Sequence, residues 1–334
     1  MNSAPFQSKT GATPHALPSL RGVLPASHTQ VMALDLAGGR AVHAGTAMAR
    51  LQQAVVAADR GSVDSWLGLG SRLAKRGAQL PSRLREMPSF DGDLLDSTQS
   101  HGDVVVQVAG PDPSTVSEAV EQLMESADGW RVRWQVEGLR AENRVEGGRG
   151  LARNPFHFTE GFGNPDDVRG ITDRALVRDD QGEPDWAVGG SYQVVRIVRF
   201  ATELWDKDSV REQERIIGRR RDGRWLDGTP TDEQPSFAAD PNGKATPLDS
   251  HVRLAAPDRR NLPPLVRRSY SYDRGNGDSG LIFSCFQRDL AKGFEAVQKR
   301  LAGEAMAKYM LTTGGGYFFV PPPGDAWIDA LFRS

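Results

Sequence analysis

Residues 103–137, DVVVQVAGPDPSTVSEAVEQLMESADGWRVRWQVE, decide the fold of the first half of the chain. Residues 103–109 form an apolar run that is typical of a strand, and residues 130–137 alternate between apolar and polar as a half-buried strand does. Between them, residues 114–126 carry apolar side chains at helical spacing. This stretch therefore predicts a strand, a helix and a strand.

The same order precedes this stretch. Residues 29–36 predict a strand, residues 47–58 a helix, and residues 66–73 a further extended segment. Two consecutive β-α-β units are typical of the split βαβ, ferredoxin-like layer, in which helices cover one face of an antiparallel sheet.

The order returns in the second half of the chain. The elements predicted there are strands at 191–201, 280–286 and 316–320 and helices at 209–217 and 290–301. We therefore predict an α+β protein of two ferredoxin-like domains, residues 26–150 and 151–334, after a disordered or extended segment at residues 1–25. The polar stretches 142–182 and 219–268 are long for plain connections, so we expect the functional residues there.

Composition excludes several classes of protein. The chain carries 41 Lys and Arg against 43 Asp and Glu, interspersed, so we expect no nucleic-acid partner. Cys285 is the only cysteine, which excludes an intrachain disulfide and a thiolate metal cluster. Residues 1–30 lack the apolar core of a signal peptide, and no window offers the about 20 apolar residues of a membrane span. We expect a cytoplasmic protein without a membrane span.

The histidines do not form a multi-histidine metal site. None of the six is paired at helical spacing or joined by cysteine: His15, His28, His43, His101, His157 and His251. Taken alone, His251 in LDSHVRLAAP reads as a hydrogen-bonded loop residue more readily than as a metal ligand.

Four motifs change this interpretation. DSHVRLAAP (249–257), LVRRSYSYD (265–273), GLIFSCFQRDLAKGFEAVQKRL (280–301) and GGGYFFVPPP (314–323) resemble the dye-decolorizing peroxidase family in order and spacing, and are most similar to its deferrochelatase/peroxidase branch. The resemblance extends through residues 189–223 and, more weakly, to 102–110 and 130–139.

The resemblance implies a haem b peroxidase that oxidises dyes, phenols or other bulky organic electron donors with hydrogen peroxide. It assigns His251 as the proximal iron ligand and Arg267 as the distal residue that stabilises charge on peroxide. In the distal motif FTEGFGNP (158–165), Glu160 stands where the family has aspartate and would act as the acid–base group. Asp289 is predicted to accept a hydrogen bond from His251, although it reads equally well as a helix-start carboxylate.

Other predicted contacts to the cofactor are Gly161, Asn164, Ser269 and Phe283. His157 is placed either near a haem propionate or in a plain loop, and Asp166 and Asp167 are rival carboxylates to Glu160. Two further functions stay open: release of iron from haem, and haem binding without catalysis, which the Asp-to-Glu difference suggests. The chain is also compatible with a homo-oligomer.

Overall fold

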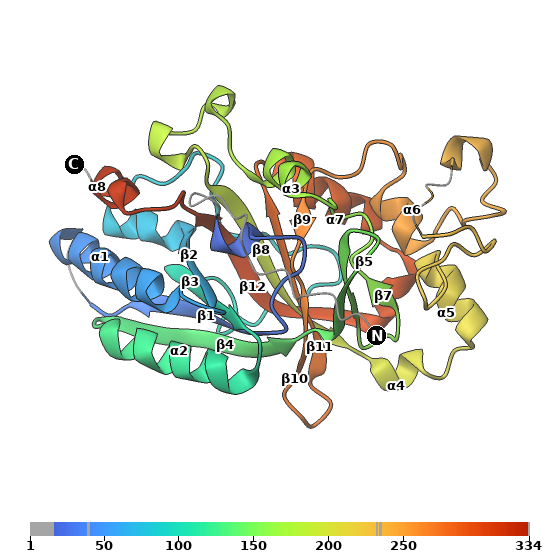
Figure 1. Ribbon diagram of the computed structural model, residues 1–334, viewed down its shortest axis with the longest axis horizontal. Coiled ribbons are helices and arrows are strands. Elements are labelled where there is room, and N and C mark those ends of the chain that lie inside the picture. The colour runs from blue at the N-terminus through green and yellow to red at the C-terminus, as the bar shows by residue number, and fades with distance from the viewer. Residues whose placement is uncertain (1–16, 39–40, 232, 234–235, 333–334) are drawn as a thin grey trace, which may run out of the picture.

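The first half of the chain has the predicted ferredoxin-like fold. The computed structural model describes residues 17–38, 41–231, 233 and 236–332. The elements of this half are β1 (His28–Leu36), α1 (Ala41–Ala58), β2 (Asp64–Gly70), β3 (Val104–Gly110), α2 (Pro113–Ser126) and β4 (Trp130–Leu139). The strands are hydrogen-bonded in the order β4-β1-β3-β2, all antiparallel, and α1 and α2 lie together against them (Figure 1).

The second half repeats this topology. Its elements are β8 (Ser191–Phe200), α5 (Val210–Ile217), β9 (Val266–Arg267), β10 (Tyr270–Asp273), β11 (Ser279–Gln287), α7 (Ala296–Leu301) and β12 (Met310–Val320), and a π-helical turn at Ala291–Glu295 precedes α7. The order β12-β8-β11 continues with β9 and β10, which pair with successive parts of β11. Sequence analysis missed these two strands because runs of two and four residues are too short to show a period.

The two halves join edge to edge into one closed ring of strands. β2 pairs with β12 through Leu69 and Phe319, and β10 pairs with both β11 and β4. Since successive side chains of a strand face opposite ways, Val31 and Ala33 point into the ring, whereas Met32 and Leu34 pack in the core outside it. The nine-stranded sheet runs from one half into the other without a break, so it does not mark a domain boundary. The division predicted at residue 150 therefore stays a prediction.

The prediction for residues 1–25 needs a correction. Residues 1–16 lie outside the described residues, but Pro18–Leu20 forms a short 3-10 helix. Leu17 and Leu20 are 2% and 4% exposed and pack in a cluster that includes Trp66 and Phe286. The segment from residue 17 is therefore part of the folded unit, because it buries apolar side chains against the sheet.

The stretch between the halves forms a small second sheet. It consists of β5 (Ala141–Glu146), β6 (Arg149–Arg153) and β7 (Thr159–Glu160), followed by α3 (Val168–Ala175). The remaining α-helices of the described residues are α4 (Thr202–Trp205), α6 (His251–Ala255) and α8 (Ala326–Leu331). No helix in the part of the chain that the structure describes is long and apolar enough to cross a bilayer.

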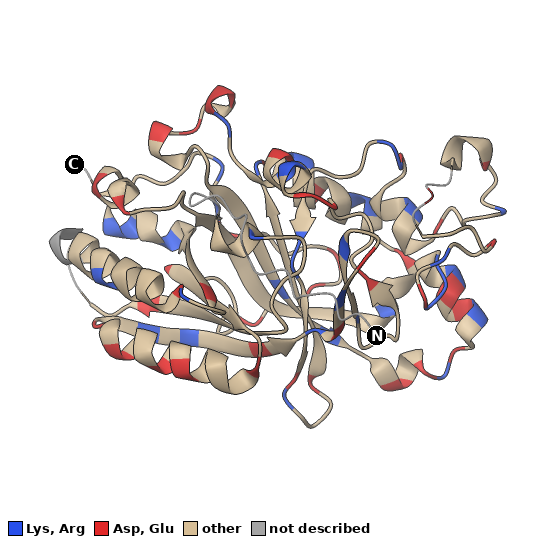
Figure 2. Ribbon diagram, viewed as in Figure 1, with Lys and Arg blue, Asp and Glu red and all other residues tan. Residues whose placement is uncertain are grey.

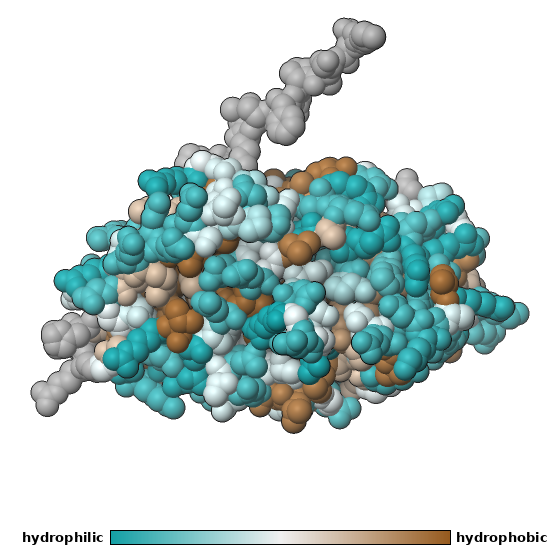
Figure 3. Space-filling model, turned by 90° about the horizontal axis from the view of Figure 1, so that it is seen from below, coloured by the Kyte–Doolittle hydropathy of each residue, from teal (hydrophilic) through white to brown (hydrophobic). Residues whose placement is uncertain are grey.

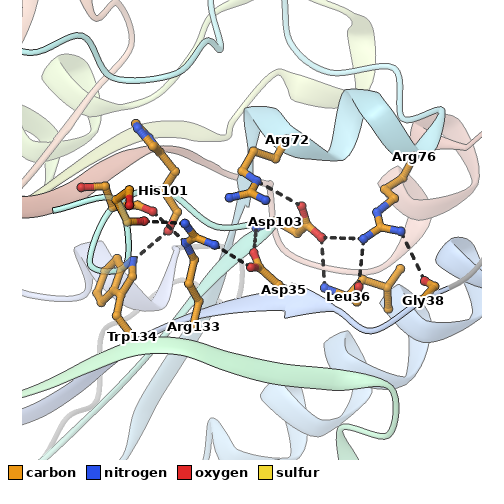
Figure 4. Close-up of polar contacts among 11 residues, drawn as sticks. Asp35, Leu36, Gly38, Arg72, Arg76, His101, Asp103, Arg133 and Trp134 are labelled. Carbon is orange, nitrogen blue, oxygen red and sulfur yellow. Dashed lines mark hydrogen bonds and ion pairs between the residues drawn. The ribbon is translucent and has the colours of Figure 1, made fainter. Parts of the chain in front are cut away.

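A cluster of charged residues fixes the start of β3. Asp103 has a side chain only 4% exposed, accepts a hydrogen bond from the Leu36 backbone N–H at 3.0 Å, and lies 3.9 Å from Arg72 and 3.6 Å from Arg76 (Figure 4). The cluster thereby ties β1, β3 and the 3-10 helix Ser71–Arg76 together. Elsewhere the acidic and basic residues are interspersed over the elements (Figure 2).

Candidate active site

A cavity of about 410 Å³ opens in the second half of the chain. Val198, Leu281 and Phe283 line its floor, while their strand neighbours Ile197 and Ile282 point into the ring, so the floor is the outer face of β8 and β11. The walls include parts of α6, α7, the 3-10 helix Ala305–Tyr309, β9, the residues around β7 and residues 91–93. The cavity thus draws on both of the polar stretches from which we expected functional residues.

His251 begins α6 and presents one free ring nitrogen to this cavity. Its Nδ1 lies 2.7 Å from Oε2 of Glu304, whose side chain is 4% exposed, and its Nε2 has no hydrogen-bond partner among the described residues. Burial alone would lower the pKa of His251, but the charge and hydrogen bond of Glu304 raise it above the usual value. With a proton held on Nδ1 by the carboxylate, Nε2 is the nitrogen that can bind a metal.

The prediction that Asp289 is this acceptor is wrong. Its Oδ1 accepts the backbone N–H groups of Ala291 and Lys292 at 2.9 and 3.0 Å, and its Oδ2 lies 3.6 Å from Arg83. Asp289 is a helix-start carboxylate, held away from α6 by the local bonds that its short side chain makes with the following turn.

Arg267 lies in β9, on the wall formed by the strands. Its backbone N–H donates to Oδ1 of Asn164 at 2.9 Å, the Asn164 amide donates back to the Arg267 carbonyl at 3.0 Å, and the guanidinium donates to the Phe162 carbonyl. Burial lowers the pKa of Arg267, against the opposing charge of Glu160. These contacts fix the side chain, so its charge faces the cavity in one place.

Glu160 ends β7 and lines the same cavity. Oε1 of Glu160 lies 3.7 Å from Nη1 of Arg140, a side chain 4% exposed that enters from the junction of β4 and β5. Arg140 is itself held by the carbonyl of Ser269 at 2.7 Å and by Oδ1 of Asn143 at 2.8 Å. Burial raises the pKa of Glu160, while the charges of Arg140 and Arg267 oppose the rise. A carboxyl group with a raised pKa is suited to moving a proton in both directions.

Most of the other predicted residues line the cavity, and His157 does not. Gly161, Asn164, Ser269 and Phe283 are on its wall. His157 is instead exposed in the turn 154–158, where its φ is 69°, and its Nε2 lies 3.0 Å from Oδ1 of Asp206. Phe156 and Phe158, on either side of it, line the cavity. The cofactor contact predicted for His157 is therefore wrong.

The rival carboxylates are held elsewhere. Asp167 caps α3 by accepting from the Gly170 N–H, and Asp166 lies 3.7 Å from Arg149. The cavity-lining residues that the structure describes include neither. Of the three candidate carboxylates, only Glu160 has access to the cavity.

Two further arginines give the cavity a positive side. Arg219 stacks on Trp225, with 3.7 Å from its guanidinium carbon to the ring centroid, and on Phe162 at 4.6 Å. It makes no ion pair with a carboxylate of the described residues, and burial together with the neighbouring Arg259 and Arg267 lowers its pKa to about 9. Burial likewise lowers the pKa of Arg259 to about 10. An anionic group would relieve this repulsion.

Sequence reasoning missed Glu304, Arg140, Arg219 and Arg259. Glu304 stands 53 residues from the histidine that it contacts, and Arg140 comes from the other half of the chain. No local spacing predicts such contacts. The only signal for Arg219 and Arg259 is that both fall in the polar stretch 219–268, which is rich in arginine.

Comparison with known proteins identifies the family. The family model described as "Dyp-type peroxidase, N-terminal" matches residues 40–140, and the one described as "Dyp-type peroxidase, C-terminal" matches residues 151–325. The chain belongs to the Dyp-type peroxidase family. The predicted resemblance is thereby confirmed.

Individual relatives agree with this assignment. The chain is 39% identical over 271 residues to a deferrochelatase of Escherichia coli (strain K12), covering 76% of this chain and 64% of that protein. A deferrochelatase of Yersinia pestis is 41% identical over 258 residues, 73% of this chain and 59% of that protein. The chain thus spans less than two thirds of the length of these relatives.

Solved structures extend the likeness over nearly the whole chain. A DyP-type peroxidase from Streptomyces coelicolor superposes with a TM-score of 0.81 at 28% identity, covering 97% of this chain and 100% of the other. Ferric DtpA from Streptomyces lividans gives a TM-score of 0.82 at 27% identity, covering 100% and 98%. The fold of two ferredoxin-like halves is confirmed.

The cavity fits haem, the cofactor of this family. Its volume is within the range of cofactor sites, its apolar floor suits a porphyrin ring, and a half-buried imidazole offers a free nitrogen. The uncompensated charge of Arg219 suits a carboxylate such as a haem propionate. Each chemical part of haem therefore has a matching group in the cavity.

Proposed function

We propose that the chain is a haem peroxidase that uses hydrogen peroxide to remove electrons from organic donors. The observation that carries this proposal is a cavity with the His251–Glu304 pair on one wall and Glu160 and Arg267 on another, in a member of the Dyp-type peroxidase family. Bound haem would supply the iron that reacts with peroxide and the redox capacity that oxidises the donor.

Each residue has a separate task in this proposal. His251 would hold the iron through Nε2, and Glu304 would keep the proton on Nδ1, which makes the imidazole a stronger donor to the metal. Glu160 would take a proton from the entering peroxide and return it to the departing oxygen. Arg267, which keeps its charge, would stabilise negative charge on that oxygen.

Arg140 serves as a positioning residue for Glu160. A glutamate side chain has one more rotatable bond than aspartate, so it needs a fixed partner to stay in reach of the ligand. Arg140 provides that partner at 3.7 Å and is itself held by two hydrogen bonds. This support explains how glutamate can occupy the position of the family's aspartate.

Absorbance spectra test the proposal. Protein reconstituted with hemin should show a ferric haem spectrum that changes in His251→Ala, and imidazole added to that variant should restore it. Rapid mixing with one equivalent of peroxide should change the spectrum of the unaltered protein. The change should be slower in Glu160→Gln, and the slowing should be smaller in Glu160→Asp, which keeps the carboxylate. If both Glu160 variants react as fast as the unaltered protein, the carboxylate has no such role.

Release of iron from haem is the second candidate function. The sequence identity of 39–41% to proteins named deferrochelatase favours it. Incubation with haem under reducing conditions would then produce iron-free protoporphyrin, which is detected by its fluorescence. A spectrum that is unaffected by peroxide and an absence of free porphyrin would together indicate a haem-binding protein without catalysis.

A further inference from the structure

The loop that follows β7 carries one large side chain, Phe162, between two glycines. Gly161 and Gly163 have φ of 110° and 88°, a conformation that favours glycine, so the peptide groups around Phe162 can rotate easily. The carbonyl groups of both glycines have partners: the Asn164 N–H donates to that of Gly161 at 3.2 Å, and Nη1 of Arg174 donates to that of Gly163 at 2.9 Å. The Phe162 carbonyl lies between these two anchors, and the backbone alone does not fix its direction.

This carbonyl group holds the side chain of Arg267. Among the described residues, the Phe162 carbonyl is the only hydrogen-bond acceptor for the Arg267 guanidinium, and Arg267 is the only donor to it. A guanidinium has five N–H groups, so others remain for a ligand in the cavity. The place of the Arg267 charge therefore depends on the direction of one carbonyl group.

The ring of Phe162 is held by two neighbours. The guanidinium carbon of Arg219 lies 4.6 Å from the ring centroid, and Nη1 of Arg219 donates to the Gly223 carbonyl at 2.7 Å. The ring also packs so closely on Gly223 that a Cβ there would overlap its Cε2 and Cζ atoms. One face of the molecule is largely hydrophilic, with apolar residues in separate patches (Figure 3), whereas Phe162 is half-buried in the cavity wall. The ring therefore occupies a space that its neighbours define.

We propose that Phe162 is a positioning residue for Arg267: its ring, held by Arg219 and Gly223, fixes the carbonyl group that fixes the distal guanidinium. This role rests on the proposed function, in which Arg267 stabilises negative charge on the departing oxygen. Arg219 and Arg267 repel each other as like charges. Phe162 binds one of them through its ring and the other through its carbonyl group, so a single residue keeps both in place.

A methyl group at position 223 tests this role without altering Phe162, Arg219 or Arg267. In Gly223→Ala, the new Cβ would displace the Phe162 ring. Fluoride bound to ferric haem is an anion that a distal cation stabilises by a hydrogen bond, so the fluoride Kd reports the position of Arg267. In the hemin-loaded protein we expect Gly223→Ala to bind fluoride about tenfold more weakly than the unaltered protein.

Gly228→Ala is the matched control. Gly228 lies in the same polar stretch, and its φ of 94° is close to the 92° of Gly223, so alanine causes similar backbone strain at either position. Among the described residues, a Cβ at Gly228 would come within 4 Å only of Nη2 of Arg220, at 3.7 Å, an ordinary van der Waals contact. Gly228→Ala should therefore lose a similar amount of stability but bind fluoride like the unaltered protein.

The effect should depend on Arg267. In an Arg267→Leu protein, which lacks the distal cation, adding Gly223→Ala should change the fluoride affinity no further. Phe162→Ala is a second variant that introduces no strain at position 223. It should weaken fluoride binding by about as much, again only when Arg267 is present.

The outcomes separate this inference from the proposed function. An unchanged fluoride affinity in Phe162→Ala, or a loss that is equally large with and without Arg267, would overturn the positioning role and leave the peroxidase proposal intact. Fluoride affinities that follow the expected pattern, in a protein whose haem does not react with peroxide, would support the positioning role and contradict the proposed function. A chain that takes up no hemin would overturn both.

Discussion

Glutamine at position 304 would remove the charge that supports His251 without changing the size of the side chain. The carboxylate lies 2.7 Å from Nδ1 and is 4% exposed, so little solvent screens the contact. A hydrogen bond to a charged group is worth about 1.5–3 kcal/mol, which corresponds to about a ten- to hundredfold change in affinity. We therefore expect Glu304→Gln to weaken haem binding by about ten- to hundredfold, in line with the effect of replacing partners of metal ligands.

The rate of haem transfer to excess apomyoglobin measures this change, and the reduction potential of the bound haem gives a second readout. The potential should rise, because a less basic imidazole stabilises ferric iron less well. Asp289→Asn is the matched control: it removes the same charge from the residue that sequence reasoning selected, and it should leave both quantities unchanged. A Glu304→Gln protein that retains haem as well as the unaltered one, or a similar loss in Asp289→Asn, would refute the role of Glu304.

Three further predictions follow from buried charges. Arg140→Gln removes a positive charge that lowers the pKa of Glu160, so on acidification the rate of reaction with peroxide should begin to fall at a higher pH than in the unaltered protein. Arg268→Gln, at a buried arginine outside the cavity, should not shift this pH profile. Asp103→Ala leaves a buried N–H of β1 without its acceptor and should lower the free energy of unfolding by about 1–3 kcal/mol in urea titrations. Burial raises the pKa of Glu183, but its hydrogen bonds lower the pKa by more, so the net value is below 4.5. The ionised Glu183 should therefore stabilise the fold above pH 4.5, and this stabilisation should be lost as the pH falls through the lowered pKa. Glu183→Gln should flatten this acid dependence of the melting temperature.

Local pattern in the sequence was sufficient for most of the secondary structure. Alternation and apolar runs predicted all four strands and both helices of the first half, with ends within a few residues except at the start of α1. These signals are local because each strand or helix buries one face, and the apolar residues of that face recur at a regular spacing within one short segment. The motifs around His251, Arg267 and Glu160 likewise located three of the residues that line the cavity.

Closure of the ring and completion of the site were decided by tertiary structure. β9 and β10 are too short to show a pattern, and they form because β11 and β4 offer unpaired edges. Glu304 reaches His251 across 53 residues, and Asn164 reaches Arg267 across 103. Such distant residues become partners because folding buries both of them, and a buried charged group is stable only beside a group of opposite charge or a hydrogen-bond partner. The motifs of the sequence therefore located His251, Glu160 and Arg267, and only the fold showed that Glu304 and Arg140 support them.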